Sequence, residues 1–115
     1  KVLLSELPVN LVEQIIRSCK MVPLTKQTIT DPDFFWQNIR EAAVNGYALE
    51  DRESSENGSC IATPVRDNKG NIIAALSFSG FVGISNPEKY LLEYLPALQE
   101  ASCKITQNLY HCYKQ

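Results

Sequence analysis

Residues 46–80 decide the fold, and they read GYALEDRESSENGSCIATPVRDNKGNIIAALSFSG. In this stretch, short apolar or alternating segments are separated by polar segments, a pattern typical of strands joined by turns. It predicts three strands, at residues 47–52, 59–66 and 71–79. The tetrapeptide Asp67-Asn68-Lys69-Gly70 is a turn signal, so the second and third strands are expected to form a hairpin. The unbroken apolar run at 72–76 predicts that the third strand is covered on both faces.

Two predicted helices precede these strands. The first covers residues 9–19 and has one apolar stripe, made by Val12, Ile15, Ile16 and Cys19. The second has Asp31 as its N-cap and Pro32 in its first position. It ends at Gly46, a residue that readily takes the left-handed conformation. The segment between the two helices lacks a helical period and is expected to be extended.

The two ends of the chain are also predicted to be helical. Residues 2–7 suit the last turns of a helix whose beginning lies before Lys1. The last helix is expected to begin at Asn86 and Pro87, and apolar residues recur along almost its whole length. Pro96 should kink or split this helix near residue 95, because proline cannot donate the backbone hydrogen bond.

This order of elements predicts an α+β fold with an antiparallel sheet and a long C-terminal helix. At 115 residues, the chain is one domain or part of one. Three strands are few for a stable domain of this length, so we expect further strands upstream of Lys1 or from a partner chain. The start inside a helix-like pattern, without an initiator methionine, also leads us to expect missing upstream sequence.

Composition argues against several classes of function. The net charge is −2 and the Lys and Arg residues are scattered, whereas unaided nucleic-acid binding usually needs a clustered basic face. No apolar run approaches the length of a membrane span, and no signal peptide opens the chain. The four cysteines form no CxxC pair. We therefore expect a cytoplasmic protein with free thiols that does not contact membranes.

Two serines stand out on the third predicted strand. Ser77 and Ser79 are two residues apart, so their side chains share one face of the sheet. They are either small residues tolerated at a strand end or two hydroxyls directed into a ligand cavity. If the hairpin turn has four residues, Cys60 lies directly across from Ser77, and a bulge at Gly70 would shift that register by one.

Other candidate residues also have two interpretations each. Glu50 lies in the middle of a strand and either points to water or is a buried acceptor for which a ligand could supply the donor. As a nucleophile, Cys60 would need a base, and the only histidine, His111, lies in a polar terminal turn. A zinc site of Cys103, His111 and Cys112 has the wrong spacing for one helical face. We therefore predict no catalytic residue, no metal site and no cofactor.

Phe34 and Trp36 lie near the start of the second predicted helix. They either pack in the core at the end of that helix or contact another subunit, since aromatic residues concentrate at interfaces. The sequence favours neither interpretation.

The middle of the chain resembles the C-terminal domain of IclR-type bacterial transcriptional regulators. In that family, a glycine–tyrosine pair ends a helix and is followed by a CIA-x-PV strand, a D-x-x-G turn and an A-A-x-S-x-S-G strand. The corresponding segments here are Gly46-Tyr47, CIATPV at 60–65, DNKG at 67–70 and AALSFSG at 74–80. The opening LLSELP at 3–8 and the Thr30-Asp31-Pro32 helix start also resemble the family pattern, so the resemblance covers essentially the whole chain.

The resemblance implies a GAF-like sensor fold with a curved antiparallel sheet. It implies that a winged helix-turn-helix domain and the first sensor strands precede Lys1, and that DNA is reached only through that domain. It also implies assembly as dimers or dimers of dimers. Family members bind small metabolites, often carboxylates and sugar acids, in a pocket beside the sheet. The positions that line this pocket correspond here to Glu50, Cys60, Ser77 and Ser79.

Three residues depart from the family pattern. Glu50 stands where Asp is common, Asn57 replaces a glycine before the Cys60 strand, and Phe81 stands where the family has proline. These differences bear on ligand identity and loop shape. We therefore expect a small-molecule sensor that is not an enzyme, in which a metabolite alters DNA binding by the missing domain. The alternatives are a domain that only oligomerises, without an effector, and a thiol enzyme that uses Cys60.

Overall fold

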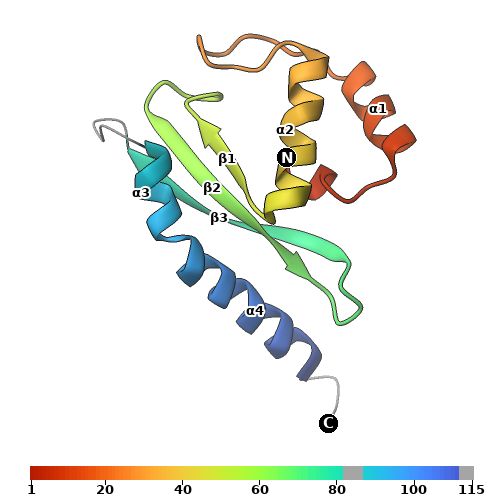
Figure 1. The fold of residues 1–115 in the computed structure, drawn as a ribbon, viewed down its shortest axis with the longest axis vertical. Helices are drawn as coiled ribbons and strands as arrows, with labels where there is room; N and C mark the ends of the chain where they lie inside the picture. The colour runs from red at the N-terminus through yellow and green to blue at the C-terminus, as the bar shows by residue number, and fades with distance from the viewer. Residues whose placement is uncertain (82–86, 112–115) are drawn as a thin grey trace.

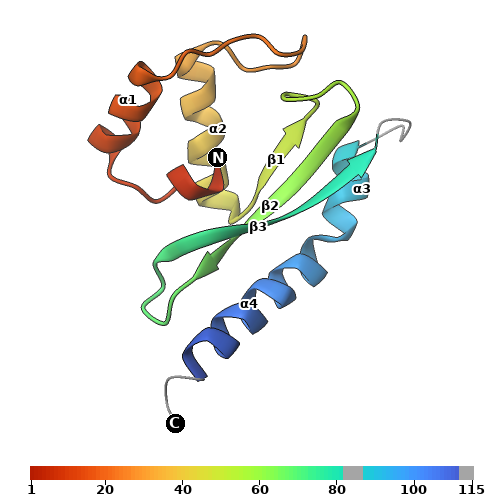
Figure 2. The same cartoon turned by 180° about the vertical axis from the view of Figure 1, so that it is seen from behind.

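The computed structural model describes residues 1–81 and 87–111, and it confirms the α+β fold with an antiparallel sheet and a long C-terminal helix (Figure 1). Its elements are η1 (Val2–Leu4), α1 (Val9–Ser18), α2 (Pro32–Asn45), β1 (Ala48–Asp51), β2 (Gly58–Arg66), β3 (Ile72–Phe81), α3 (Pro87–Glu93) and α4 (Leu95–His111). Figures 1 and 2 show α3 and α4 along one face of the sheet. The helices α1 and α2 lie on the opposite side of the molecule, with α2 next to β1. Where the sequence predicts the end of a helix at residues 2–7, the structure has only the short 3-10 turn η1.

The limits of the helices follow from local signals in the sequence. The Asp31 side chain accepts a hydrogen bond from the backbone amide of Asp33, at 3.1 Å, and so caps α2. Gly46 ends this helix in the left-handed conformation, with φ of +76°. At Pro96, the predicted interruption is confirmed, because α3 and α4 are separate helices on either side of Tyr94. The third strand, predicted to end at residue 79, continues to Phe81, and residues 82–86 lie outside the described residues.

The sheet has the order β1-β2-β3, and both pairs of neighbours are antiparallel. The predicted hairpin between β2 and β3 is confirmed. Asp67 closes its turn, since its Oδ1 accepts from the backbone amides of Lys69 and Asn71, both at 2.9 Å. Gly70 takes the positive φ that this turn requires, +88°.

The register of the hairpin differs from the expected one. Cys60 lies opposite Ser79 and not opposite Ser77, which faces Ala62. Arg66 pairs with Ile72, one residue beyond the expected partner, and an irregularity between Val65 and Arg66 shifts the pairing by one more. Because a shift of two residues keeps every side chain on its own face, the predicted residues stay together on one side of the sheet.

One face of the sheet packs against α3 and α4. Exposure alternates strictly along β2, and the residues on this face are buried: Ser59, Ile61, Thr63 and Val65. Two helix side chains fasten α4 to the end of β2. Ser102 Oγ donates to the carbonyl of Pro64 at 2.6 Å, and Thr106 Oγ1 donates to the carbonyl of Arg66 at 2.7 Å. Because α3 and α4 cover this face, only the opposite face of β2 is open to a ligand.

On the other face, β3 is only partly covered, so the prediction that both of its faces are covered is wrong for this chain. Ile73 is 48% exposed, and Ala75, Ser77 and Ser79 on the same face are exposed as well. On this side the short turn η1 lies against β3, and β3 is an edge strand of the described sheet, so much of this face stays open.

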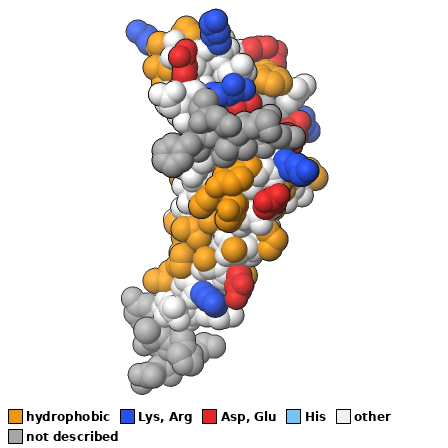
Figure 3. Space-filling view, turned by 90° about the vertical axis from the view of Figure 1, so that its left-hand side faces the viewer, with side chains coloured by type: hydrophobic (Ala, Val, Ile, Leu, Met, Phe, Trp, Pro, Cys, Tyr) orange, Lys and Arg blue, Asp and Glu red, His pale blue; other side chains and the backbone are white. Residues whose placement is uncertain are grey.

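Apart from the core between the sheet and α3 and α4, a second core joins α1 to α2. Val12, Ile16 and Ile39 form a buried cluster between α1 and α2, and Trp36 is half-buried against it, together with Leu4, Met21 and Phe35. Trp36 therefore packs in the core, whereas Phe34 is 53% exposed. Figure 3 shows hydrophobic side chains gathered along α3 and α4. The large exposed ones are Tyr94, between the two helices, and Ile105 and Leu109 on α4. Within the described residues, no helix is long and apolar enough to cross a membrane.

Candidate functional site

The register of the sheet aligns three of the four predicted site residues in one row. Glu50 on β1 pairs with Cys60 on β2, and Cys60 pairs with Ser79 on β3. Ser77 lies in the adjacent row, opposite Ala62. All four side chains therefore belong to the face of the sheet that α3 and α4 leave uncovered.

A cavity of about 290 Å³ opens on this face, beside β1. Its lining residues are Lys1, Val2, Ala48, Leu49, Glu50, Glu53, Ser54, Cys60 and Ala62. The structure thus brings Glu50 and Cys60 together in the cavity wall. Ser77 and Ser79 are not in this lining, but lie further along the same face, on the exposed strand β3.

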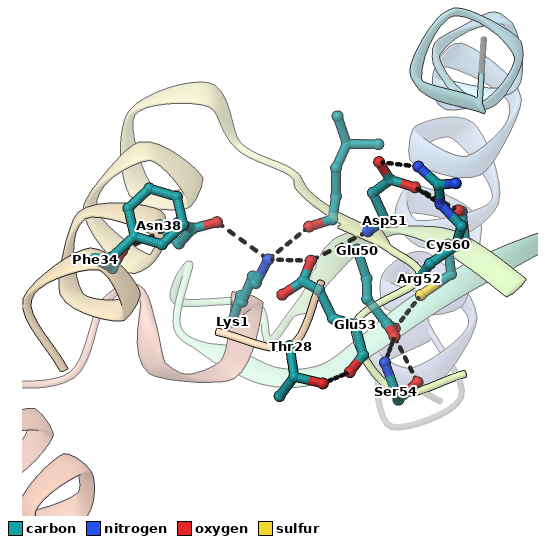
Figure 4. Close-up of polar contacts among 12 residues, drawn as sticks. Lys1, Thr28, Phe34, Asn38, Glu50, Asp51, Arg52, Glu53, Ser54 and Cys60 are labelled. Carbon is teal, nitrogen blue, oxygen red and sulfur yellow. Dashed lines mark hydrogen bonds and ion pairs between the residues drawn. The ribbon is translucent and has the colours of Figure 1, made fainter. Parts of the chain in front are cut away.

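Glu50 is a hydrogen-bond acceptor in the cavity wall, and Figure 4 shows its contacts with Ser54 and Cys60. Its Oε1 accepts from the backbone amide of Ser54, at 2.9 Å, and from the Ser54 hydroxyl. Its Oε2 accepts from the thiol of Cys60 at 3.1 Å. Partial burial raises the pKa of this carboxyl, but the hydrogen bonds from Ser54 and Cys60 together outweigh it and hold the pKa below its ordinary value. Glu50 is therefore ionised at neutral pH and acts only as an acceptor.

Cys60 has the opposite electrostatic environment. Burial, followed by its hydrogen bond to Glu50 and the negative charges of Glu50 and Glu53, raises the pKa of this thiol to about 12. A thiol nucleophile must be a thiolate, and a thiolate here would face an ionised carboxylate. The geometry therefore opposes the thiol-enzyme alternative and leaves Cys60 as a small, weakly donating part of the wall.

We expect Cys60 to react slowly with iodoacetamide at pH 8. Raising its pKa from 9.0 to about 12 lowers the thiolate fraction about a thousandfold at that pH. Glu50→Gln should accelerate the reaction, because it removes the charge that disfavours the thiolate. Mass spectrometry of labelled peptides measures both effects, with the exposed Cys19 and Cys103 as internal controls. Labelling of Cys60 as fast as that of these two thiols would contradict the assignment.

Lys1 is a cavity residue that the sequence did not single out. Its Nζ donates to Glu53 Oε2 at 2.9 Å, to the Leu49 carbonyl at 2.8 Å and to Asn38 Oδ1 at 3.1 Å (Figure 4). The side chains of Lys1 and Glu53 are only 12% and 18% exposed. This ammonium group therefore joins η1, α2, β1 and the β1–β2 loop at one point. No local pattern could have revealed it, since its partners lie 37 to 52 residues away.

Three other hollows of the described part of the chain contain none of the predicted site residues, although one of them is lined by the charged residues Glu13, Arg17 and Asp33. Another, of about 490 Å³, lies between η1, α1 and α2, and its lining is apolar apart from Ser5 and Arg40. Within residues 1–81 and 87–111, no group of three His, Cys, Asp or Glu residues could hold a metal ion. Cys112, a member of the zinc grouping that the sequence spacing argued against, lies outside the described residues. The cavity beside β1 is therefore the candidate site.

Comparison with known proteins finds relatives that match most of this chain. The chain is 34% identical over 114 residues to the HTH-type transcriptional regulator KdgR of Escherichia coli K12, covering 98% of this chain and 43% of KdgR. It is 31% identical over 91 residues to the HTH-type transcriptional repressor AllR of Klebsiella pneumoniae, covering 79% of this chain and 34% of AllR. The chain thus spans less than half the length of either relative.

Solved structures show the same fold. The crystal structure of the C-terminal domain of E. coli KdgR superposes with a TM-score of 0.82 at 32% identity, covering 91% of this chain and 63% of that one. The inducer-binding domain of the PobR transcription factor from Acinetobacter, solved as a double mutant in complex with 3-hydroxybenzoic acid, gives 0.84 at 28% identity, covering 91% and 62%. The relatives are named regulators and repressors, and their family is a regulatory domain and not an enzyme. The family described as the C-terminal domain of the bacterial transcriptional regulator IclR matches residues 1–107, and this chain belongs to it.

Proposed function

We propose that this chain is the effector-binding part of a transcriptional regulator and that its cavity takes a small carboxylate bearing at least one hydroxyl. The observation that carries this proposal is the row of Glu50, Cys60 and Ser79 beside the cavity. The row offers an ionised acceptor at one end and a hydroxyl donor at the other, with a small thiol between them. A few convergent polar groups in a mainly apolar wall are what orient a small ligand.

Charge decides how such a ligand lies. Glu50 is ionised, so it accepts from a ligand hydroxyl, and a ligand carboxylate beside it would have to be protonated. The ligand carboxylate therefore lies toward β3, where the hydroxyls of Ser77 and Ser79 can donate to it. Hydrogen bonds to a charged group contribute about 1.5–3 kcal/mol each when they are desolvated.

The ligand class has support from one relative. The PobR inducer-binding domain was solved with 3-hydroxybenzoic acid, which has one carboxyl and one hydroxyl group. Small carboxylates and sugar acids with hydroxyls belong to the same chemical class. The departure of Glu50 from the common Asp lengthens the acceptor by one methylene group, which favours a ligand hydroxyl placed further from β1.

We infer the action of the whole protein by analogy with these regulators. We place a DNA-binding domain and further sensor strands upstream of Lys1, in a cytoplasmic regulator. The effector shifts the equilibrium between arrangements of the DNA-binding domains because it binds one arrangement more tightly than the other. The exposed apolar residues along α3 and α4 and the open edge of β3 support self-association as a dimer or a dimer of dimers (Figure 3).

Calorimetry on the full-length regulator tests the site. The probes are 3-hydroxybenzoate, lactate and glycerate, and the tightest binder is then used on the variants. Ser77→Ala and Ser79→Ala should each weaken binding about tenfold or more, since 1.4 kcal/mol is a factor of ten. Ser18→Ala, which removes an exposed hydroxyl on α1, serves as the matched control and should change nothing.

The outcomes separate the competing functions. Unchanged affinity in both serine variants would place the site elsewhere. A protein that self-associates in sedimentation but binds none of the carboxylates would support the domain that only oligomerises. Cys60→Ser should retain binding, because the thiol serves only as part of the wall, whereas a thiol enzyme would lose its activity.

A further inference from the structure

The hydrogen-bonding capacity of Glu50 is largely used within the protein. A carboxylate offers about four acceptor positions, two on each oxygen. The amide and the hydroxyl of Ser54 take both positions on Oε1. The thiol of Cys60 takes one position on Oε2, at 3.1 Å. A single acceptor position therefore remains, on Oε2 and next to Cys60.

Ser54 is held in place by the segments around it, so it does not simply move aside. The hydroxyls of Thr25 and Thr28, in the connection between α1 and α2, donate to the carbonyls of Arg52 and Glu53. Glu53 is itself tied to Lys1 through its Oε2. On the far side of the loop, the amide of Arg52 donates to the carbonyl of Gly58 at 3.1 Å. The residues before Ser54 are thus fixed from two directions.

We propose that Ser54 is a positioning residue that occupies one oxygen of Glu50 and so limits the site to an effector that donates a single hydroxyl to the other oxygen. This inference rests on the proposed function, because it concerns how the same cavity recognises its ligand. A vicinal diol could bind a free carboxylate through both oxygens. With Ser54 in place, the second hydroxyl of such a diol finds no acceptor on Glu50. The site then selects for the position of one ligand hydroxyl, and a second, adjacent hydroxyl adds no affinity through Glu50.

The first test needs no ligand. In the full-length protein, ¹³C NMR of the Glu50 side-chain carboxyl is followed against pH for wild type, Ser54→Ala and Ser54→Thr. The pKa of Glu50 should rise in Ser54→Ala, because one of the hydrogen bonds that lower it is lost. Ser54→Thr keeps the hydroxyl and should restore the wild-type titration. Ser54 is exposed, so neither change disturbs the core.

The second test compares lactate, which has one hydroxyl, with glycerate, which has two on neighbouring carbons. Wild type should bind them equally within about twofold. Ser54→Ala should favour glycerate over lactate by roughly two- to tenfold, the range expected for one additional hydrogen bond. Ser54→Thr should behave as wild type does. In the double variant Ser54→Ala with Glu50→Gln, the new preference should disappear.

These arms separate the failure of this inference from the failure of the proposed function. An unchanged titration of Glu50 in Ser54→Ala would overturn the positioning role. Binding of both probes with no gain for glycerate in Ser54→Ala would overturn the selectivity. If lactate, glycerate and 3-hydroxybenzoate all fail to bind to any variant, the proposed ligand class is contradicted and the selectivity built on it falls with it, while the titration still decides the positioning role. If only 3-hydroxybenzoate binds, the ligand class stands and the proposed selectivity among hydroxy acids is overturned.

Discussion

Replacing Ile61 with alanine is expected to lower the free energy of unfolding by about 2–5 kcal/mol. Ile61 is fully buried, at 0% exposure, on the face of β2 that packs against α4. The substitution removes apolar contacts and leaves a cavity that the sheet and helix cannot collapse to fill. Proteins of this length are typically stable by roughly 5–15 kcal/mol, so the loss is a large share of the total. Urea unfolding followed by circular dichroism measures it.

Ile73→Ala is the matched control for this experiment. Ile73 is the same residue type on the neighbouring strand, but it is 48% exposed. Its truncation should cost less than about 1 kcal/mol, because solvent takes the place of the lost atoms. Equal losses in the two variants would contradict the arrangement in which α4 covers only one face of the sheet.

Replacing Lys1 with methionine is expected to lower the free energy of unfolding by about 2–3 kcal/mol. The substitution keeps most of the apolar stem but leaves the Glu53 carboxylate, the Leu49 carbonyl and the Asn38 side chain without their shared donor. A charge left without a partner in a buried pair costs about 3–5 kcal/mol. The slight exposure of Lys1 and Glu53 lowers that figure. Urea unfolding again gives the measurement.

An exposed ion pair elsewhere in the chain provides the control. Lys104 and Glu100 lie 3.4 Å apart on α4, and their side chains are 68% and 70% exposed. Lys104→Met should therefore cost no more than about 0.5 kcal/mol. A double-mutant cycle of Lys1→Met with Glu53→Gln should lose less than the sum of the single changes, since each removes the same interaction. Additive losses would show that the two groups do not interact.

Much of the fold could be predicted because its signals act over a few residues. The limits of α2 match the sequence prediction, since a capping aspartate, a proline and a left-handed glycine act on the adjacent backbone. The split at Pro96 and the turn at Asp67–Gly70 are local for the same reason. Strand ends were less accurate, and β3 extends to Phe81 although it was predicted to end at residue 79. Strand length depends on pairing with β2, which is a long-range interaction.

The candidate site was predictable in part. The period of two along each strand, together with the resemblance to the regulator family, brought Glu50, Cys60, Ser77 and Ser79 to one face, as the structure has them. The predicted cross-strand partner of Cys60, Ser77, was wrong, because the position of a bulge depends on how the whole strand packs. Lys1 and Ser54 were missed, since each acts through contacts that form only after the chain has folded.

The sequence by itself determined which segments are helix and strand, how the strands connect, and which residue types share the ligand face. Periodicity, turn residues and caps depend on neighbours along the chain, so they can be recognised in the sequence alone. Only the tertiary structure decided that Cys60 pairs with Ser79, that Glu50 has one acceptor position left, and that Lys1 lines the cavity. It also set the protonation of Cys60, because burial and the nearby carboxylates that raise its pKa arise from segments distant in sequence that packing brings together.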